Sequence, residues 1–371
     1  MRILHVVTLV SPDEAYGGPV SVALNQSAEL RRRGHDVTVT AATRGYQMVP
    51  AERNGVPLRL FATRKPIPAL KFAGMRAPTM TRWFHAVGDE FDIVHVHFTR
   101  DLVVLPMALA ARRRHIPYVL QTHGMVVPSR HPLAAPVDCM CTRRALRDAG
   151  AVFYLTPREC HELNAVAGGG LRLTPLANGV PDYAAAANPT GPPEVLFAAR
   201  LHDRKRPLVF VEMAKRTLAA GIDARFTLIG PDEGAGPTVL AAIGTEPRIS
   251  WLGPLPHPEL IERMARATAC VLPSIRDPYP MSVLEAMAVG VPVVIADDCG
   301  LAPVVRRNRC GIVAGPAPEA MADALTELLT APDLAAGMGR RGRAVAQSEM
   351  GMGPVGDRLV ATYSALVEGE P

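Results

Sequence analysis

Residues 268 to 297 constrain the fold of this chain more than any other stretch. The apolar run Thr268 to Ser274 has the length of a strand, and Met281 to Val289 carries helix formers and ends at Gly290, a typical helix C-cap. A second apolar run, Pro292 to Ala296, follows directly. Strand, loop, helix and strand in this order predict a βαβ unit of a parallel sheet, which binds ligands at the carboxyl ends of its strands.

Two carboxylates flank the start of this predicted helix. Asp277 lies in the loop at the binding edge, and Glu285 follows eight residues later, in the first turns of the helix. Carboxylates accept hydrogen bonds from hydroxyls, which suits a sugar at one end of a ligand and a ribose at the other. The helix start at Met281 and Ser282 offers N–H groups and a positive dipole end to a diphosphate. On the spacing alone, an ordinary βαβ unit with a solvated Glu285 fits equally well.

The acidic pair resembles the Glu-x7-Glu signature of family-4 retaining glycosyltransferases, which have the GT-B architecture. The resemblance implies an α/β fold with two Rossmann-like parallel-sheet domains facing across a cleft. It also implies that Asp277 holds hydroxyls of a donor sugar and that Glu285 holds the ribose of its nucleotide. The chain departs from the family pattern at Asp277, which replaces Glu, and at Pro280, which replaces Gly. The shorter acid changes the reach by roughly an ångström, which can alter the choice of donor.

Two motifs in the first half carry the same resemblance. Gly17 and Gly18 precede an expected helix over 20–33 and look like the family's glycine loop, where a ligand can approach the backbone closely. A plain tight turn explains the two glycines equally well. His123 follows an expected strand over 117–121, and the resemblance implies that it contacts the donor sugar. His95 and His97 compete for that role, although structural packing is the simpler explanation for both.

A cationic pair opens the second half of the chain. Arg200 and Lys205 follow an expected strand over 194–199, so they lie at the same binding edge as the acidic pair. A leaving diphosphate needs such cations. The pair resembles the family's Arg and Lys that bind the donor phosphates. Gly253, after an expected strand over 249–252, is predicted to lie near the base.

The length of 371 residues predicts two domains, each with a core of its own. The predicted boundaries are 1–180 for an acceptor-side domain, 181–193 for a linker rich in Ala and Pro, 194–352 for a nucleotide-sugar-binding domain and 353–371 for a helix that crosses back to the first domain. The six cysteines show neither a disulfide framework nor a metal-binding spacing. No metal and no cofactor are therefore expected.

Charge is distributed unevenly along the chain. Residues 1–180 carry 22 Lys and Arg against 13 Asp and Glu, which suggests an anionic membrane surface or a phosphorylated acceptor as partner. An Arg-rich composition is the alternative explanation. Residues 62–88 mix bulky apolar side chains with Lys71, Arg76 and Arg82, as an interfacial segment does, although helices packed on the sheet fit as well. No nucleic acid partner is expected.

The start of the chain indicates a cytoplasmic protein. Met1 and Arg2 lead directly into a predicted strand, without the layout of a signal peptide. No apolar run approaches the ~20 residues of a membrane-spanning helix. Contact with the inner face of the membrane, as a peripheral protein, remains compatible with the basic first half.

Together these features predict a retaining glycosyltransferase that moves a sugar from a nucleotide-sugar donor to a glycan, glycolipid or small-molecule acceptor, in cell-envelope or polysaccharide biosynthesis. The expected catalytic residues are Arg200, Lys205, His123 and Asp277, and the expected donor-binding residues are Gly17, Gly18, Glu285, Met281, Ser282 and Gly253. Two alternatives are a sugar-nucleotide epimerase of the same architecture, which needs no acceptor site, and a two-domain sugar-binding protein without chemistry.

Overall fold

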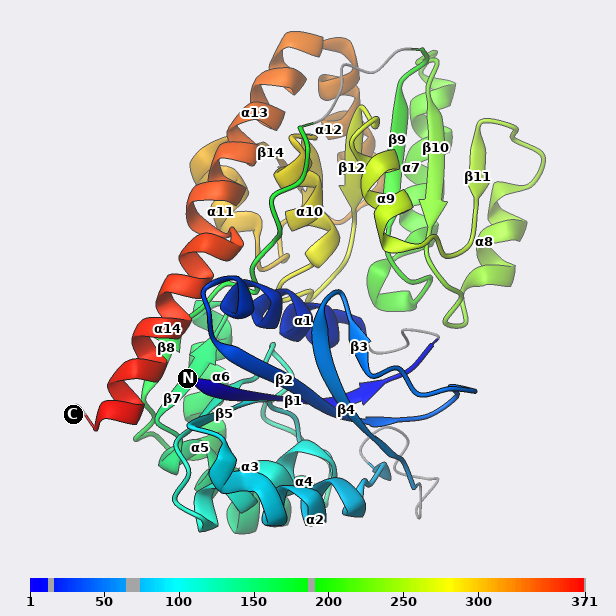
Figure 1. Cartoon of the computed structure of the whole chain (residues 1–371). Helices are drawn as coiled ribbons and strands as arrows, with labels where there is room; N and C mark the ends of the chain where they lie inside the picture. Colours follow the sequence, from blue (N-terminus) through cyan, green and yellow to red (C-terminus); the bar gives the residue numbers. More distant parts are fainter. Residues whose placement is uncertain (13–16, 65–73, 186–190, 370–371) are drawn as a thin grey trace. The chain divides into compact units, whose positions relative to one another are not determined.

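The fold is given by a computed structural model, which describes residues 1–12, 17–64, 74–185 and 191–369 (Figure 1). The chain divides into two compact units. Unit 1 comprises Met1–Gly179 and Met352–Pro371, and unit 2 comprises Val180–Gly351. This division falls one residue before the boundary that the sequence analysis placed after residue 180. The fold class, α/β with two Rossmann-like parallel-sheet units, is as predicted.

Unit 1 is built on a sheet whose described strands follow the order β3-β4-β2-β1-β5-β6-β7-β8. Among these strands, only β3 and β4 pair in antiparallel fashion. The bounds are Arg2–Val10 (β1), Asp36–Thr43 (β2), Glu52–Arg53 (β3), Val56–Ala62 (β4), Ile93–His97 (β5), Tyr118–Gln121 (β6), Ala151–Tyr154 (β7) and Leu173–Pro175 (β8). The strand order reverses between β1 and β5, where doubly wound folds bind ligands.

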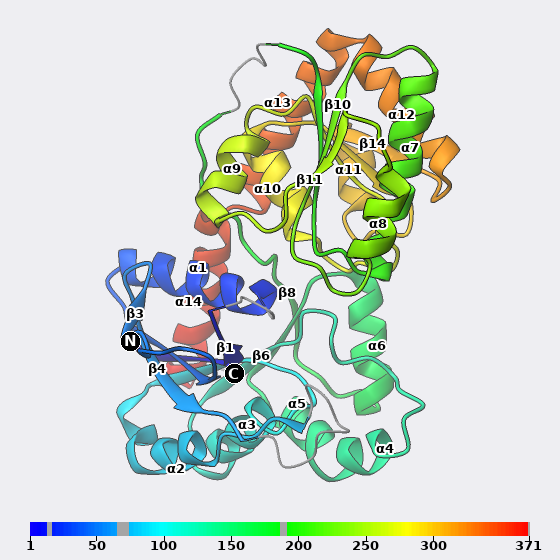
Figure 2. The same ribbon diagram turned by 90° about the vertical axis from the view of Figure 1, so that its right-hand side faces the viewer.

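Helices cover both faces of this sheet (Figures 1 and 2). One face carries α2 (Pro78–Val87), α3 (Val104–Arg113), α5 (Arg143–Asp148) and α6 (Pro157–Ala167). The other carries α1 (Gly17–Arg32) and α14 (Met352–Glu368). Leu359 and Tyr363 of α14 are buried against Ile3 of β1 and Ile93 of β5. The last helix of the chain therefore forms part of the core of unit 1.

Two helices of unit 1 differ from the sequence prediction. The first helix, α1, begins at Gly17 rather than at residue 20, so Gly17 and Gly18 form its first turn instead of a loop before it. Pro19 fits there because the first N–H groups of a helix have no intrahelical acceptor. The helical stretch between β6 and β7 is not one regular helix, because a π-helical turn, η3 (Asp138–Thr142), lies between α4 (Ala134–Val137) and α5.

Unit 2 has a parallel sheet whose described strands follow the order β11-β10-β9-β12-β13-β14. The strands span Glu194–Ala198 (β9), Arg225–Ile229 (β10), Ile249–Trp251 (β11), Ala269–Leu272 (β12), Val293–Ala296 (β13) and Gly311–Ala314 (β14). The order reverses between β9 and β12. This reversal makes their carboxyl ends the predicted ligand edge of unit 2.

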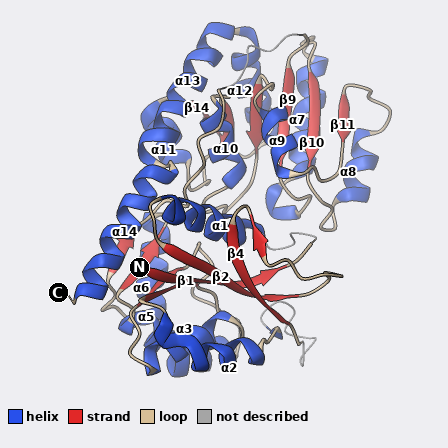
Figure 3. Cartoon of the chain, viewed as in Figure 1, coloured by secondary structure: helices blue, strands red, loops and turns tan. Residues whose placement is uncertain are grey.

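The helices of unit 2 also lie on both faces of its sheet (Figure 3). One group packs together as α7 (Pro207–Ala219), α8 (Gly236–Ile243) and α12 (Pro318–Thr330), and the other as α9 (His257–Met264), α10 (Met281–Val289), α11 (Ala302–Asn308) and α13 (Pro332–Glu349). The predicted stop of α10 at Gly290 is confirmed, with a left-handed φ of 92°. In the described ranges, no helix is long and apolar enough to cross a bilayer.

Candidate active site

Three residues predicted as catalytic follow the two strands at the switch point of unit 2. Arg200 comes two residues after β9, and Lys205 ends the short 3-10 turn η4 (Asp203–Lys205). Asp277 lies in the loop between β12 and α10. Because β9 and β12 are adjacent and parallel, side chains 72 residues apart in the sequence meet at one edge.

Lys205 and Asp277 form a largely buried ion pair. The ammonium group of Lys205 donates to Oδ2 of Asp277, whose residue is only 6 % exposed. A backbone hydrogen bond also holds the loop that carries Asp277, because the N–H of Gly300 donates to the Asp277 carbonyl over 2.9 Å. A Cβ on Gly300 would stand 1.8 Å from the Pro278 carbonyl oxygen, so only glycine permits this approach. The pairing fixes the position of both functional groups.

Arg200 has an acidic partner of its own. Its Nη1 donates to Oε1 of Glu233 over 2.6 Å, and about half of the Arg200 side chain is exposed. Glu233 belongs to the loop between β10 and α8. The predicted role of Arg200 on a donor phosphate stays a prediction. To bind an anion, Arg200 must either break its bond to Glu233 or bind the anion through its other N–H groups while Glu233 stays in place.

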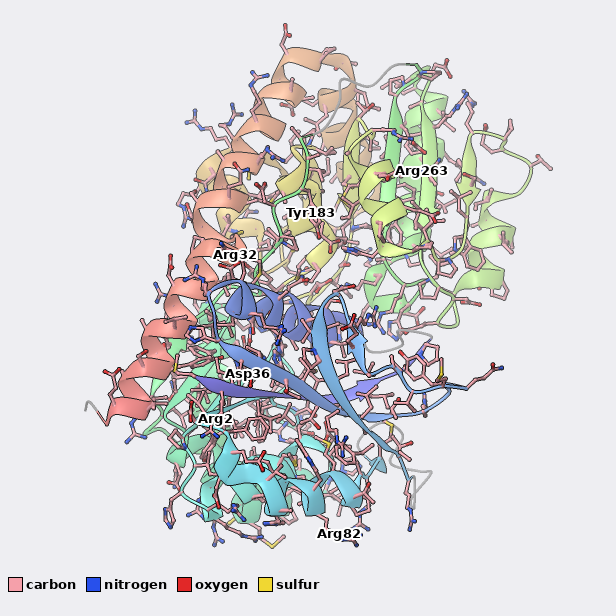
Figure 4. The ribbon with its side chains drawn as sticks, in the orientation of Figure 1. Arg2, Arg32, Asp36, Arg82, Tyr183 and Arg263 are labelled. Carbon is pink, nitrogen blue, oxygen red and sulfur yellow. The ribbon has the colours of Figure 1, made fainter. Side chains whose placement is uncertain are left out.

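Glu285 is buried on the first turns of α10, where the sequence analysis placed it. Its Oε1 lies 3.0 Å from Nε2 of His257, at the start of α9. The ring of Tyr183 lies 6.3 Å from that of His257, and its hydroxyl has no hydrogen-bond partner among the described residues (Figure 4). Burial, and next the charge of Glu285, raise the pKa of Tyr183 well above its ordinary value. The carboxylate therefore faces polar groups from two other segments.

The other predicted donor-binding residues of unit 2 also follow the carboxyl ends of strands. Met281 and Ser282 form the first turn of α10 and are half-buried. The carbonyl of Pro280 accepts from Val283 and Leu284, so the helix begins directly behind it. Gly253 follows β11 with a left-handed φ of 75°, and no described atom lies within 4 Å of the place of a Cβ. A ligand could approach the backbone there.

In unit 1, Gly18 is similarly open. It lies in the first turn of α1, after the carboxyl end of β1, and no described atom lies within 4 Å of the place of its Cβ. Gly17 precedes it in the same turn. Both glycines thus lie at the switch point of unit 1, although residues 13–16 before them lie outside the described part of the chain.

His123 lies just after β6 and is 9 % exposed. Its φ is 50°, in the left-handed region that few residues with a side chain adopt. Its Nδ1 lies 3.1 Å from Oδ1 of Asn178, and its Nε2 lies 2.8 Å from Nδ1 of His97. Both ring nitrogens are therefore engaged within unit 1. The expected contact with a donor sugar stays a prediction, and through the ring it would require one of these bonds to break.

His123 is the outer member of a histidine layer, which we define as His5, His95, His97 and His123. The layer lies across β1, β5 and β6, under α1 and α14. His95 and His97 stack at 4.7 Å between centroids, and His97 and His123 at 5.0 Å. Nε2 of His97 lies 3.1 Å from Nδ1 of His5, and Nδ1 of His95 lies 2.6 Å from the hydroxyl of Tyr363.

The hydrogen bonds give this layer a direction. Oδ1 of Asn178 can only accept, so His123 carries its hydrogen on Nδ1 and accepts at Nε2. His97 must then donate from Nδ1, and His5 must do the same toward His97. Burial lowers the pKa of His123 to about 4 and that of His5 to about 3. Burial, and then the neighbouring imidazoles, also lower the pKa values of His95 and His97. The layer is neutral at physiological pH.

Three of these histidines also have the composition of a metal site. The ring nitrogens of His5, His95 and His97 lie within 4.8 Å of one another. A metal ion would have to displace the hydrogen bond between His5 and His97, and it would bring charge into a layer of neutral rings. The donor set fits a hydrogen-bonded relay better than a metal centre.

Two family models together match most of the chain. The model described as "Glycosyl transferase 4-like domain" matches residues 17–179, and "Glycosyl transferases group 1" matches residues 182–345. The D-inositol 3-phosphate glycosyltransferase 1 of Catenulispora acidiphila is 29 % identical over 76 % of this chain and 74 % of its own length.

This chain is a family-4 glycosyltransferase.

Further relatives and solved structures agree with this assignment. The alpha-D-kanosaminyltransferase of Streptomyces kanamyceticus is 27 % identical to the glycosyltransferase, over 70 % of this chain and 73 % of its own. HepE of Anabaena, solved in complex with UDP, has a TM-score of 0.78 at 18 % identity, covering 99 % of this chain and 100 % of its own. The latter similarity shows the GT-B fold. Membership of an enzyme family also disfavours the alternative of a binding protein without chemistry.

Sequence reasoning missed several polar residues around the site of this glycosyltransferase. Glu233 and His257 were not identified, and each pairs with a predicted site residue. No local pattern marks them, because each contact joins separate loops. Glu159, in the first turn of α6, was not predicted as a site residue either. Thr156 does accept from the Glu159 N–H over 3.2 Å, but the Glu159 carboxylate binds elsewhere.

Proposed function

We propose that this glycosyltransferase transfers a sugar from a nucleotide-sugar donor to an acceptor hydroxyl with retention of the anomeric configuration. The observation that carries this proposal is a group of paired polar side chains in unit 2. Lys205 with Asp277 and Arg200 with Glu233 lie at its switch point, and Glu285, on α10, pairs with His257 at the start of α9. Each pair offers a group that a nucleotide sugar can bind.

The donor is proposed to replace protein partners with its own atoms. Lys205 and Arg200 take oxygens of the diphosphate, which the first turn of α10 also attracts through its N–H groups and dipole. Asp277 then accepts from hydroxyls of the sugar, and Glu285 accepts from the ribose in place of His257. Such exchanges leave every buried charge with hydrogen-bond partners before and after binding.

In the proposed reaction, the acceptor attacks C1 of the sugar from the side that the diphosphate leaves. The bond from C1 to the phosphate oxygen breaks, the bond from C1 to the acceptor oxygen forms on the same face, and the leaving phosphate takes the acceptor proton. Negative charge grows on the diphosphate in the transition state. Arg200 and Lys205 stabilise this charge, and no metal ion is assigned a part.

Unit 1 is proposed to bind the acceptor, a glycan, glycolipid or small-molecule hydroxyl compound of cell-envelope or polysaccharide biosynthesis. The suggested contact with anionic membrane also involves unit 1. Of the three basic residues singled out, Lys71 lies outside the described residues, whereas Arg76 and Arg82 are exposed. Arg82, on α2, points outward (Figure 4). Sedimentation with anionic vesicles at low salt tests this, since the binding should disappear when Arg76 and Arg82 are reversed to Glu.

Slow hydrolysis of nucleotide sugars tests the main proposal. The purified chain is incubated with UDP-glucose, UDP-N-acetylglucosamine, GDP-mannose and ADP-glucose, and release of the nucleoside diphosphate is measured. UDP-glucose is the first probe, because HepE of Anabaena was solved with it. Myo-inositol phosphate and 2-deoxystreptamine are then added as acceptors. A product with the donor's anomeric configuration supports the proposal, and an inverted product overturns retention. If the chain neither bound nor hydrolysed any of these donors, the proposal would be overturned altogether.

A further inference from the structure

Glu159, near the start of α6, buries its carboxylate against the loop that carries His123. The residue is 2 % exposed. Its Oε1 accepts from the hydroxyl of Thr122 and from the backbone N–H of Gly124, the two residues that flank His123. Its Oε2 accepts from the N–H of Leu155 over 2.7 Å. One side chain therefore ties the end of β6 to the end of β7.

The loop that this carboxylate holds has an unfavourable backbone conformation. His123 has a φ of 50° and Gly124 a φ of 71°. Glycine adopts this region freely, but a residue with a Cβ does so at a cost and persists there only when its surroundings over-determine it. Glu159 binds one residue on each side of His123, which is the arrangement needed to hold that conformation.

A carboxylate suits this position better than an amide would. The N–H groups of Gly124 and Leu155 can only donate, so both oxygens of Glu159 must accept. No Lys or Arg pairs with Glu159 among the described residues. Its charge is instead stabilised by these donors and by the positive end of the α6 dipole, because Glu159 lies in the first turn. The change Glu159→Gln would turn an amide nitrogen, itself a donor, toward one of these N–H groups.

We propose that Glu159 is a positioning residue for glycosyl transfer. It holds the backbone at His123 so that this residue keeps its place at the carboxyl end of β6. From there the ring bonds to Asn178 and His97. The role rests on the proposed function, in which His123 acts on the donor sugar. Glu159 itself is 2 % exposed and acts only through the loop.

The first test compares two carboxylates of the same helix. Glu159→Gln should lower kcat for donor hydrolysis or transfer by on the order of a hundredfold, as a displaced catalytic group does. The affinity for UDP, measured by calorimetry, should stay unchanged, because Glu159 contacts neither Gly17 and Gly18 nor the residues of unit 2 that are proposed to bind the nucleotide, Lys205, Arg200 and Glu285. Glu162→Gln is the matched control, since Glu162 lies one turn away and forms a surface pair with Arg158. Wild-type kcat in Glu159→Gln would overturn the role.

A double-mutant cycle separates positioning from general stability. If Glu159 acts through His123, then Glu159→Gln added to His123→Ala should cost little beyond the single His123→Ala change. If the losses in kcat of the two single variants instead multiply in the double variant, Glu159 has only a general structural role and the proposal is overturned. Glu159→Asp serves as a second variant, because it keeps the charge and shortens the reach, and it should recover part of kcat.

Hydrogen exchange measures the contact itself, whether or not the protein is active with a given donor. In Glu159→Gln, the amides of Gly124 and Leu155 should exchange faster, while those in the middle of α6 keep their wild-type rates. Unchanged exchange at both amides would overturn the proposal. If the wild type turns over none of the four nucleotide sugars, the proposed function fails and the catalytic role of Glu159 fails with it, even where exchange confirms the contact.

Discussion

Each unit buries a characteristic group of polar side chains, and the two groups are built in opposite ways. Unit 2 places acids beside bases at its switch point, as in Lys205 with Asp277. Unit 1 instead buries the neutral histidine layer, in which each ring nitrogen finds an uncharged partner or none. Charged pairs can exchange one partner for a ligand of the same sign, whereas a neutral relay is disturbed by any added charge. The difference indicates that unit 2 is adapted to bind an anion and unit 1 to hold a fixed geometry.

Acid should break the histidine layer first, with the largest effect on stability. The pKa of His5 is lowered from 6.5 to about 3, and that of His123 from 6.5 to about 4. Below pH 6.5 the unfolded chain therefore binds more protons than the folded chain. The free energy of unfolding is highest above that pH and decreases as the pH falls toward 4. Each of the two contributes roughly 3 kcal/mol over this range. Thermal unfolding from pH 7 to pH 4 measures the loss.

His5→Phe should make this pH dependence shallower, because it removes one buried titrating group. The exposed His85 on α2 provides the control, and His85→Gln should leave the slope as it is. A slope that does not differ between His5→Phe and the wild type would show that the pKa of His5 is not lowered in the folded protein.

Removing a cation from unit 2 should have the next largest effect. Lys205→Ala leaves Asp277 buried without its partner and removes the charge that we propose stabilises the leaving diphosphate. Turnover should fall about a hundredfold, equivalent to roughly 3 kcal/mol, with a smaller change in donor affinity. Lys215→Ala, on the exposed side of α7, is the control lysine. Near wild-type turnover in Lys205→Ala would remove this residue from the mechanism.

Glu285→Gln tests the proposed contact of unit 2 with the ribose of the nucleotide. The contact is expected in both the ground state and the transition state, so it should weaken binding of the free nucleoside diphosphate by about tenfold while kcat changes little. Calorimetry with UDP and the other nucleoside diphosphates provides the measurement. The exposed Glu259 in the first turn of α9 gives the control variant Glu259→Gln. Equal affinities in wild type and Glu285→Gln would exclude the ribose role.

The smallest expected effect is an increase in the affinity for a nucleoside diphosphate. Glu233 competes with an incoming diphosphate for Arg200, and this pair is half-exposed. Glu233→Gln should therefore tighten binding of a nucleoside diphosphate by about threefold, the scale of an exposed ion pair, and leave the nucleoside alone unaffected. Weaker binding after the change would mean that Glu233 positions Arg200 instead of competing for it.

The sequence predicted the order of elements well, because buried parallel strands read as continuous apolar runs and the helices end at glycines such as Gly290. It placed Asp277 and Lys205 at carboxyl ends of strands, yet their pairing depends on which strands are neighbours, and that is a property of the sheet. Glu159 shows the same limit. It lies in the first turn of α6, yet its carboxylate binds a loop 35 residues earlier.

Local irregularities were the least predictable part of the fold. The π-helical turn at Asp138–Thr142 has helix-compatible residues throughout, and Arg100 holds Asp138 from another segment. The early start of α1 at Gly17 also contradicts propensity, since glycine is a poor helix former. The contact of Arg100 with Asp138 joins separate segments, which a sequence pattern alone does not report.

The assignment of α14 to unit 1 has a consequence for the order in which the protein can be made. During synthesis, the strands of unit 1 leave the ribosome first, but the face formed by Ile3, Ile93 and Phe153 has no cover until Leu359 and Tyr363 follow. All of unit 2 is translated in between. Unit 2 can therefore fold on a growing chain whose first unit is still incomplete, and a nascent chain stopped at residue 351 would present that apolar face to chaperones.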